Sequence, residues 1–366
     1  MLVPFKKALA LTAWRVFKRR LHSVLHYKQL RVSGKHFRST RTFALLLVFG
    51  FGLSIMMSAC TGGNASSPNA TAPNGSSASS AIRIGYQVYG TLNIVRAKGD
   101  LEKQLQSQGI SVQWTRFPGG PQLLEALNAG SLDYGHTGET PPIFAQAAGA
   151  PLVYIANELP SPNSEAILVA KDSPIQKVAD LKGKKVALNK GSNVHYLLVR
   201  ALEAAGLKYS DIQPVYLPPA DARGAFERGS VDAWVIWDPY FGAAQKSLGA
   251  RVLRDGEGLV ANREFYLAAK PFADQHPERI KVILEETQKV DEWAKRNPDQ
   301  VATLLAPQLN VDVPTLSKIS QRRNYGTQRI QPDVVAYQQQ IADTFFKLKL
   351  VPKQLDVKEV AEVPQK

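Results

Sequence analysis

The sequence predicts an α/β fold of two lobes, and three observations support this prediction. From residue 81 onward, short apolar strands alternate with amphipathic helices, which is typical of parallel βαβ units. The run 231–237 is almost entirely apolar, as expected for a central parallel strand that is buried on both faces. A chain of 366 residues is also long enough for two domains that each bury a core.

In the first part of this region, apolar periodicity places two strands and a helix. Alternating apolar residues predict a strand over 82–88, and Val112 with Trp114 begin a second strand. A short helix is expected over 122–129, because a Gly-Pro pair precedes it and Gly130 follows it.

The clearest helix covers 192–205. Its apolar residues recur at helical spacing, Ser192 is suited to the N-cap, and Gly206 closes it. Asp238 and Pro239 begin a further helix by the same capping logic. The C-terminal part is expected to be mainly helical, over 278–296, 299–306 and 334–348.

These elements divide into two lobes. We expect one lobe to combine residues 81–165 with about 264–356, and the other to cover about 171–263. The C-terminal helices then pack back onto the first lobe. Two chain crossings between the lobes would form a hinge.

The net charge of +14 describes the N-terminus and not the folded part. Eleven of the 45 Lys and Arg residues lie within residues 1–42, and the first acidic residue is Asp100. Residues 43–366 therefore carry 34 basic against 31 acidic side chains, a net charge of +3. This balance argues against a nucleic-acid partner.

Cys60 is the only cysteine, which excludes a disulfide framework and a Cys-based zinc site. It follows an apolar run over 43–57 and a basic stretch, the order found in a secretory signal. Met57-Ser58-Ala59-Cys60 resembles the lipobox of bacterial lipoproteins, which predicts acylation of Cys60. An ordinary signal followed by a free cysteine is the alternative.

Residues 1–60 are thus expected to form a signal peptide, and residues 61–80 a flexible tether without charge or aromatic residues. The leader exceeds the usual length of about 15 to 30 residues. Initiation at Val32 would leave a compact basic region before the apolar run.

Four turns between strands and helices share one chemistry: 118–121, 137–142, 190–193 and 237–240. Glycine lets the backbone approach a ligand, and Ser or Thr hydroxyls donate hydrogen bonds. The first N–H groups of a helix point outward at the positive end of its dipole. In open α/β sheets such turns meet at the carboxyl ends of the strands, so together they predict an oxyanion site.

Seven stretches of this sequence, in the same order, resemble the aliphatic sulfonate-binding proteins of bacterial ABC importers. The similarity extends from about 82 to 356, and the stretches are 82–87, 117–127, 137–149, 178–183, 190–195, 218–223 and 231–240. The resemblance implies the type II periplasmic binding protein fold, two α/β lobes joined by a hinge that close on a ligand. It also implies a periplasmic receptor that works with a permease and its ATPase, and we expect this receptor to be a monomer. The lipobox-like Cys60 adds attachment to the membrane through a lipid. No cofactor or metal is implied.

The resemblance also implies a set of site residues. Gly119, Thr137, Gly138, Gly191, Ser192 and Asn193 would hold the sulfonate oxygens, with His195 on the same turn. The cleft would be lined by Gln87, Trp237 and Asp238, Arg223 would supply a positive charge, and Glu139 would lie beside the head group. Residues 88–93 depart from the Lys-rich or Gly-rich turn of relatives, which leaves the organic end of the ligand open.

Several of these residues have a structural alternative. Asp238 before a proline is also a standard N-cap, and Glu139 would repel an anion directly. Arg223 can pair with Asp221 or Glu227 on its own helix. His195, at a helix N-terminus, would be mostly neutral and a single donor.

The sequence therefore predicts a sulfonate receptor, with taurine, nitrate or another small anion or sulfur compound as alternative ligands. An enzyme is the rival class, because one fold can serve catalysis as well as binding. We find no nucleophile elbow, metal helix or phosphate loop, so an enzyme is not expected. A sensory protein would need a transmitter module that residues after 350 do not supply.

Overall fold

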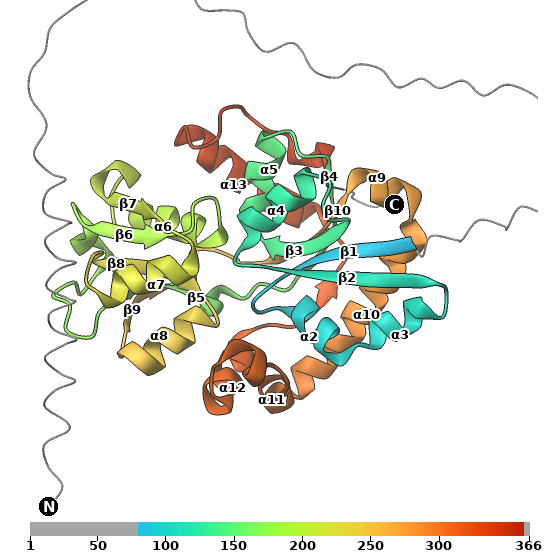
Figure 1. Cartoon of the computed structure of the whole chain (residues 1–366). Coiled ribbons are helices and arrows are strands. Elements are labelled where there is room, and N and C mark those ends of the chain that lie inside the picture. Colours follow the sequence, from blue (N-terminus) through green and yellow to red (C-terminus); the bar gives the residue numbers. More distant parts are fainter. Residues whose placement is uncertain (1–79, 362–366) are drawn as a thin grey trace, which may run out of the picture. The chain divides into compact units, whose positions relative to one another are not determined.

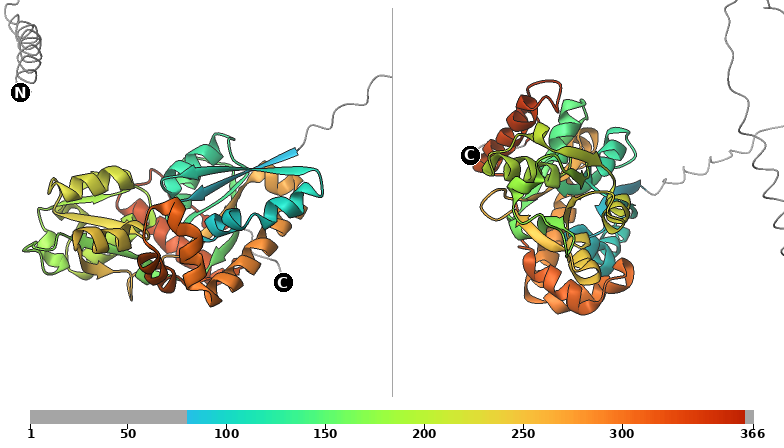
Figure 2. Two further views of the ribbon diagram at one scale, coloured as in Figure 1. Left: turned by 60° about the horizontal axis from the view of Figure 1, so that its bottom comes forward. Right: turned by 90° about the vertical axis from the view of Figure 1, so that its left-hand side faces the viewer.

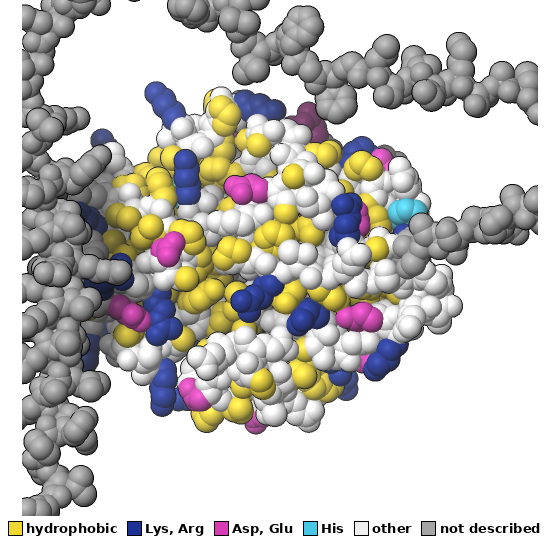
Figure 3. All heavy atoms as spheres, viewed as in Figure 1, with side chains coloured by type: hydrophobic (Ala, Val, Ile, Leu, Met, Phe, Trp, Pro, Cys, Tyr) yellow, Lys and Arg dark blue, Asp and Glu magenta, His cyan; other side chains and the backbone are white. Residues whose placement is uncertain are grey.

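The computed structural model describes residues 80–361, which form two α/β lobes (Figure 1). Cys60, the leader and most of the tether lie outside the described residues, so their predicted roles stay predictions. Among the residues that are described, the helices are too short or too polar to cross a membrane. On the face shown in Figure 3, basic and acidic side chains are interspersed over both lobes.

The first lobe contains a mixed sheet with the strand order β11-β4-β10-β3-β1-β2. Its strands are β1 (Ser80–Gln87), β2 (Ile110–Phe117), β3 (Tyr134–Gly138), β4 (Leu152–Glu158), β10 (Glu264–Ala269) and β11 (Thr327–Gln328). β1 pairs in parallel with β2 and β3, whereas β10 runs antiparallel between β3 and β4. Because β10 returns from the second lobe, the chain crosses between the lobes twice.

Helices cover both faces of this sheet. They are α2 (Thr91–Lys98), α3 (Asp100–Gln106), α4 (Gly120–Asn128), α5 (Pro141–Ala147), α9 (Lys270–Gln275), α10 (Pro277–Arg296), α11 (Pro298–Leu309), α12 (Val313–Arg322) and α13 (Pro332–Lys347). The C-terminal helices contact elements of this lobe: α10 and α11 pack on α2, and α13 packs on α5. The apolar pattern of the sequence did not predict α12, which also contacts the second lobe (Figure 2).

The second lobe contains a sheet with the order β7-β6-β8-β5-β9. Its elements are β5 (Glu165–Val169), β6 (Lys185–Leu188), β7 (Gln213–Tyr216), β8 (Ala233–Trp237), β9 (Arg251–Asp255), α6 (Asn193–Ala204), α7 (Pro219–Glu227) and α8 (Tyr240–Leu248). Short 3₁₀ turns connect some elements: Pro162–Ser164, Val178–Leu181, Tyr209–Asp211 and, in the first lobe, Val357–Glu359.

The apolar run 231–237 gives the central strand β8, but its pairing differs from the prediction. β8 is parallel to β6 on one side and antiparallel to β5 on the other. A parallel pair needs a long crossover connection. β5 instead enters directly from the first lobe, so its direction relative to β8 is not set by a βαβ unit.

Helix α6 shows how local signals set the element boundaries. Ser192 occupies the N-cap position and Gly206 follows the helix with a φ of 72°, which glycine adopts without strain. The Ser192 hydroxyl, however, donates to Asn189 O at 2.7 Å instead of capping the helix. The predicted position of the helix is right, and the Ser192 side chain stabilises the turn that precedes it.

One part of the core continues from one lobe to the other. Phe345 of α13 packs edge-on against Phe144 of α5, with ring centroids 5.0 Å apart. Tyr196 of α6, in the second lobe, lies 6.2 Å from Phe345. These three residues belong to a single apolar cluster, so burial of apolar area helps to join the lobes.

Candidate ligand site between the lobes

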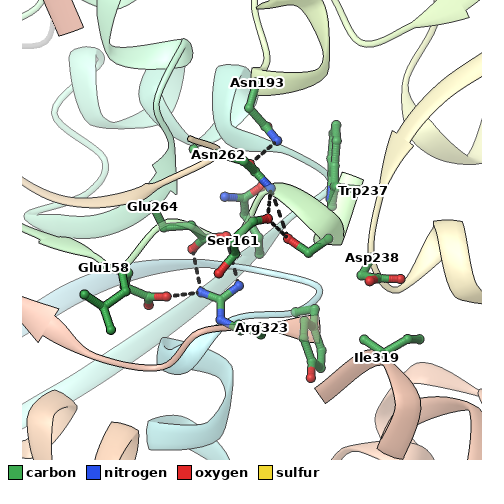
Figure 4. A pocket seen from close by; sticks show the side chains of 14 residues that line it. Glu158, Ser161, Asn193, Trp237, Asp238, Asn262, Glu264, Ile319 and Arg323 are labelled. Atoms are coloured by element: carbon green, nitrogen blue, oxygen red, sulfur yellow. Dashed lines mark hydrogen bonds and ion pairs between the residues drawn. The ribbon is translucent and has the colours of Figure 1, made fainter. Parts of the chain in front are cut away.

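A pocket lies where the two lobes meet, beside the segments that connect them (Figure 4). It is lined by Gln87, Tyr89, Gly138, Glu158, Leu159, Ser161, Ser164, Asn193, Trp237, Asp238, Asn262, Glu264, Ile319 and Arg323. The free space inside it is ≈ 30 Å³, room for one or two water molecules. A larger ligand gains access only if the lobes separate or side chains move.

A buried arginine forms the hinge end of the pocket. The Arg323 side chain is 7% exposed, and its Nη2 lies 2.5 Å from Glu158 Oε2 and 3.3 Å from Glu264 Oε2. Tyr266 donates its hydroxyl to Glu158 Oε1, and His136 Nε2 lies 3.2 Å from Glu264 Oε2. Burial alone would raise the pKa of Glu264, but Arg323 and His136 hold it below its usual value. The charge of Arg323 is therefore compensated within the protein.

Asn262 ties the segments that connect the lobes to the start of α6. Its φ of 47° is left-handed, a region in which asparagine is enriched. Asn262 Nδ2 donates to Ser161 O at 2.8 Å and to Ser164 Oγ at 3.0 Å. Its Oδ1 accepts from Asn193 Nδ2 at 2.9 Å, and the same Nδ2 donates to Glu165 Oε2. The predicted residue Asn193 thus lies at the junction of both lobes.

Three predicted residues of the first lobe lie at the ends of β1 and β3. Gln87 Nε2 donates to His136 O at 3.2 Å, which orients the amide at the pocket wall. A Cβ on Gly138 would lie 2.8 Å from Asn193 Oδ1, so glycine permits this close approach of α6. Thr137 is fully buried, and its Oγ1 has no hydrogen-bond partner within residues 80–361.

The Gly119 turn faces the second lobe closely. A Cβ on Gly119 would lie 2.7 Å from Asn189 Nδ2 and 3.5 Å from Trp237 Cη2. Asn189 is 6% exposed, and neither its Nδ2 nor Gln122 Oε1 has a hydrogen-bond partner in the described part of the chain. A buried amide donor without a partner is costly, so a ligand acceptor would satisfy it here.

The turn before α6 is held from behind by a histidine. Gly191 N–H donates to His195 Nδ1 at 3.2 Å, and His195 Nε2 lies 2.9 Å from Tyr209 Oη. Burial lowers the pKa of His195 to about 3, so the ring is neutral and its proton is on Nε2. The structure places His195 against Tyr209 and Phe345, away from the pocket residues.

Glu139 lies beside the site but is not an ordinary carboxylate. It is fully buried, and its Oε2 accepts from Arg263 N–H at 3.0 Å. Burial raises the pKa of Glu139 to about 7, and burial together with Glu139 raises the pKa of Glu165. A charged Glu139 would repel an anionic ligand, but a protonated Glu139 would not. The raised pKa is therefore compatible with an anion beside this residue.

Asp238 lines the pocket, but both of its oxygens are engaged. Arg322 donates Nε to Oδ2 at 2.9 Å and Nη2 to Oδ1 at 2.7 Å. Gly242 N–H donates to Oδ1 at 3.0 Å, so Asp238 also serves the start of α8. Burial raises the pKa of Asp238 to about 6, although Arg322 opposes the shift.

Arg223 is not among the pocket residues. It lies partly exposed on α7, where Nε donates to Glu227 Oε1 at 2.7 Å and Nη2 to Ser247 Oγ at 3.3 Å. It borders a separate surface hollow, together with Tyr240 and Lys246. The pairing within its own helix is the alternative that the sequence left open.

Sequence reasoning did not single out Asn189, Asn262, Arg322 or Arg323. Asn189 follows β6 directly and precedes the predicted turn, so its position could have been noticed. The two arginines at the end of α12 look like solvated charges, because their partners Asp238 and the two glutamates are far away in the sequence.

Comparisons with known proteins agree with this architecture. The family model described as NMT1/THI5 like matches residues 105–301. An aliphatic sulfonates-binding protein of Escherichia coli (strain K12) is 50% identical over 282 residues, covering 76% of this chain and 88% of that protein. One of Bacillus subtilis (strain 168) is 35% identical over 283 residues, 77% of this chain and 85% of its own length.

A solved structure is similar as well. The alkanesulfonate-binding protein from Xanthomonas axonopodis pv. citri, bound to MOPS, superposes with a TM-score of 0.74 at 38% identity and covers 77% of this chain and 98% of its own. Two α/β lobes with a polar pocket at their junction define a periplasmic-type binding protein. The chain belongs to the family of the aliphatic sulfonate-binding proteins.

Proposed function

We propose that this protein is an extracytoplasmic receptor that captures aliphatic sulfonates between its lobes and delivers them to an ABC importer. The observation that carries the proposal is the unpartnered, buried amide of Asn189, which faces the Gly119 turn from the opposite lobe. Two relatives of the chain are described as aliphatic sulfonates-binding proteins, and one similar solved structure holds MOPS, itself a sulfonate.

The chemistry of the ligand fits these donors. A sulfonate is a strong acid, so it stays a monoanion and accepts hydrogen bonds without donating them. Neutral donors can therefore hold it, whereas a charged carboxylate facing it is a penalty. Among the pocket carboxylates, Asp238 is paired with Arg322, and Glu158 and Glu264 with Arg323.

We further propose that binding joins the lobes. The first lobe contributes Gln87, Gly119, Thr137 and Gly138, and the second contributes Asn189, the 191–193 turn and Trp237. A ligand that touches both sets stabilises the closed form by its differential affinity for it. The lobe boundaries implied here are 81–165 with about 264–356, and about 171–263.

Calorimetry on the purified protein tests the ligand class. Short alkanesulfonates should bind about a hundredfold or more tightly than sulfate, roughly 3 kcal/mol, because sulfate lacks the organic tail and carries a second charge. Taurine and nitrate in the same panel distinguish the alternative ligands. Equal affinity for sulfate and ethanesulfonate would refute the proposal.

We place the protein outside the cytoplasmic membrane in this proposal, attached to the membrane through an acylated Cys60. Two or more acyl chains make such attachment stable, whereas one is marginal. Detergent should be needed to extract the protein, and Cys60→Ala should release it or stall its processing. Full recovery of wild-type protein without detergent would contradict the anchor.

A further inference from the structure

The two lobes are joined by an ion pair at the edge of the pocket. Arg322 ends α12, which packs on α11 and so belongs to the first lobe, whereas Asp238 follows β8 of the second lobe. The guanidinium donates to both carboxylate oxygens, from Nε to Oδ2 at 2.9 Å and from Nη2 to Oδ1 at 2.7 Å. The Asp238 side chain is 3% exposed and that of Arg322 25%. Bidentate pairs of this kind fix geometry as well as charge.

Close packing of α12 on α8 surrounds this pair. A Cβ on Gly242 of α8 would lie only 2.7 Å from Ile319 Cδ1, so the helices meet at a glycine. The Arg322 guanidinium lies 4.3 Å from the centre of the Phe241 ring, and Nη1 donates to Gln245 Oε1 at 3.3 Å. Each of these contacts depends on the two lobes staying together.

We propose that Arg322 is a positioning residue that clamps the lobes in the closed form and thereby sets how slowly a bound ligand leaves. It does so through Asp238, which it holds against α12, and through the contact between Gly242 and Ile319. The effect on ligand dissociation rests on the proposed function. The effect on lobe closure does not, because these contacts join only residues of the protein itself.

The physics of buried ion pairs gives the clamp a recognisable signature. Removing one partner leaves the other charge buried without compensation, and this is strongly unfavourable. Opening of the lobes would return Asp238 to water, so loss of Arg322 favours the open form. Removing both charges takes away that driving force, so a double variant should open less than the Arg322 variant alone.

Small-angle scattering of the ligand-free protein tests closure directly. Arg322→Gln should enlarge the radius of gyration, and Asp238→Asn combined with Arg322→Gln should restore part of the difference. Gly242→Ala should also enlarge it, because its methyl group would lie 2.7 Å from Ile319 Cδ1 and 3.0 Å from Arg322 Nη2 and so pushes α12 away without removing either charge. Arg200→Gln, which removes an exposed pair within α6, and Gly224→Ala in α7 are matched controls that should change nothing.

Stopped-flow binding of an alkanesulfonate supplies the second readout. Arg322→Gln and Gly242→Ala should raise the dissociation rate about tenfold or more and change the association rate less than twofold. A fold defect would instead lower the fraction of active protein. Unchanged radii for both variants, or equal changes in both rates, overturn the clamp. Absence of sulfonate binding in the wild type overturns the proposed function, and the scattering result still decides the clamp.

Discussion

The two ends of the site are built differently. At the hinge end, the charges of Arg323, Glu158 and Glu264 are paired with each other inside the protein. At the Gly119 end, which adjoins the pocket at Trp237, the side-chain amides of Gln122 and Asn189 are neutral, and Asn189 Nδ2 has no hydrogen-bond partner in the described residues. The first arrangement stabilises the junction of the lobes by itself, whereas the second is completed by an acceptor from outside. Changes at the hinge end should therefore affect stability, and changes at the Gly119 end should affect binding.

The largest effect is expected at the hinge end, for Arg323→Met. This change leaves Glu158 and Glu264 buried without their counter-charge, which should lower the free energy of unfolding by about 3 to 5 kcal/mol. Denaturant unfolding measures it. Arg200→Met, which breaks an exposed pair with Glu203, should cost less than about 1 kcal/mol. A similar decrease in the free energy of unfolding for both variants would show that the buried ion pairs contribute no more to stability than an exposed pair.

The next effect concerns pH and Glu139. Burial raises its pKa from 4.5 to about 7, so the folded protein keeps a proton that the unfolded chain has released. The stabilising contribution is complete below pH 4.5 and is lost as pH rises to about 7. The free energy of unfolding should fall by about 3 kcal/mol over this window because of this group.

Glu139→Gln should remove that slope and leave the protein more stable at pH 7.5. Glutamine keeps an oxygen that can accept the Arg263 N–H and carries no charge. Glu203→Gln, an exposed control on α6, should leave the pH dependence unchanged. Thermal unfolding at several pH values checks both variants, and an unaltered slope in Glu139→Gln would locate the titration elsewhere.

The third effect moves to the Gly119 end. Asn189→Ala removes a donor to a charged ligand, which should weaken all alkanesulfonates alike by about 1.5 to 3 kcal/mol. Ser192→Ala should cost less, about 0.5 to 1.5 kcal/mol, because its hydroxyl supports Asn189 O. Calorimetry with alkanesulfonates of two tail lengths measures both losses and shows whether each is independent of the tail. Wild-type affinity in Asn189→Ala would remove Asn189 from the site.

The parts of the site that the sequence predicts are those with local signals. The turns at Gly119 and Gly191 were identifiable because glycine precedes a helix, and α6 because its apolar spacing has clear ends. His195 was placed on the right turn, but its side chain points toward Tyr209. The apolar spacing predicts where the helix lies. It does not predict which face of the helix is covered by neighbouring elements.

The parts that could not be predicted depend on distant contacts. Arg322 meets Asp238 across 84 residues, and Arg323 meets Glu158 across 165. Nothing local distinguishes these arginines from solvated ones, and only the fold brings their partners close. For Arg223, a local partner in Glu227 was visible in the sequence, and the structure contains that pair.

For the shortest ligand, methanesulfonate, the smallest effect is expected for Trp237, and this effect is also the most specific. Its ring edge borders the Gly119 turn, and it packs edge-on against Tyr240, with centroids 6.5 Å apart. We expect it to contact the organic tail and not the head group. Burial of each methylene contributes about 0.8 kcal/mol, so wild-type affinity should rise with tail length until the apolar wall ends.

Trp237→Ala should therefore flatten the dependence of affinity on tail length and change methanesulfonate by less than about 1 kcal/mol. Calorimetry across methane- to hexanesulfonate measures the slope. Trp293→Ala is the matched control, because Trp293 lies on α10 with Lys98 over its ring and outside the pocket. The slope should survive in that variant. An equal loss for every tail length in Trp237→Ala would instead place the ring beside the head group, since only a contact with the tail scales with the number of methylenes.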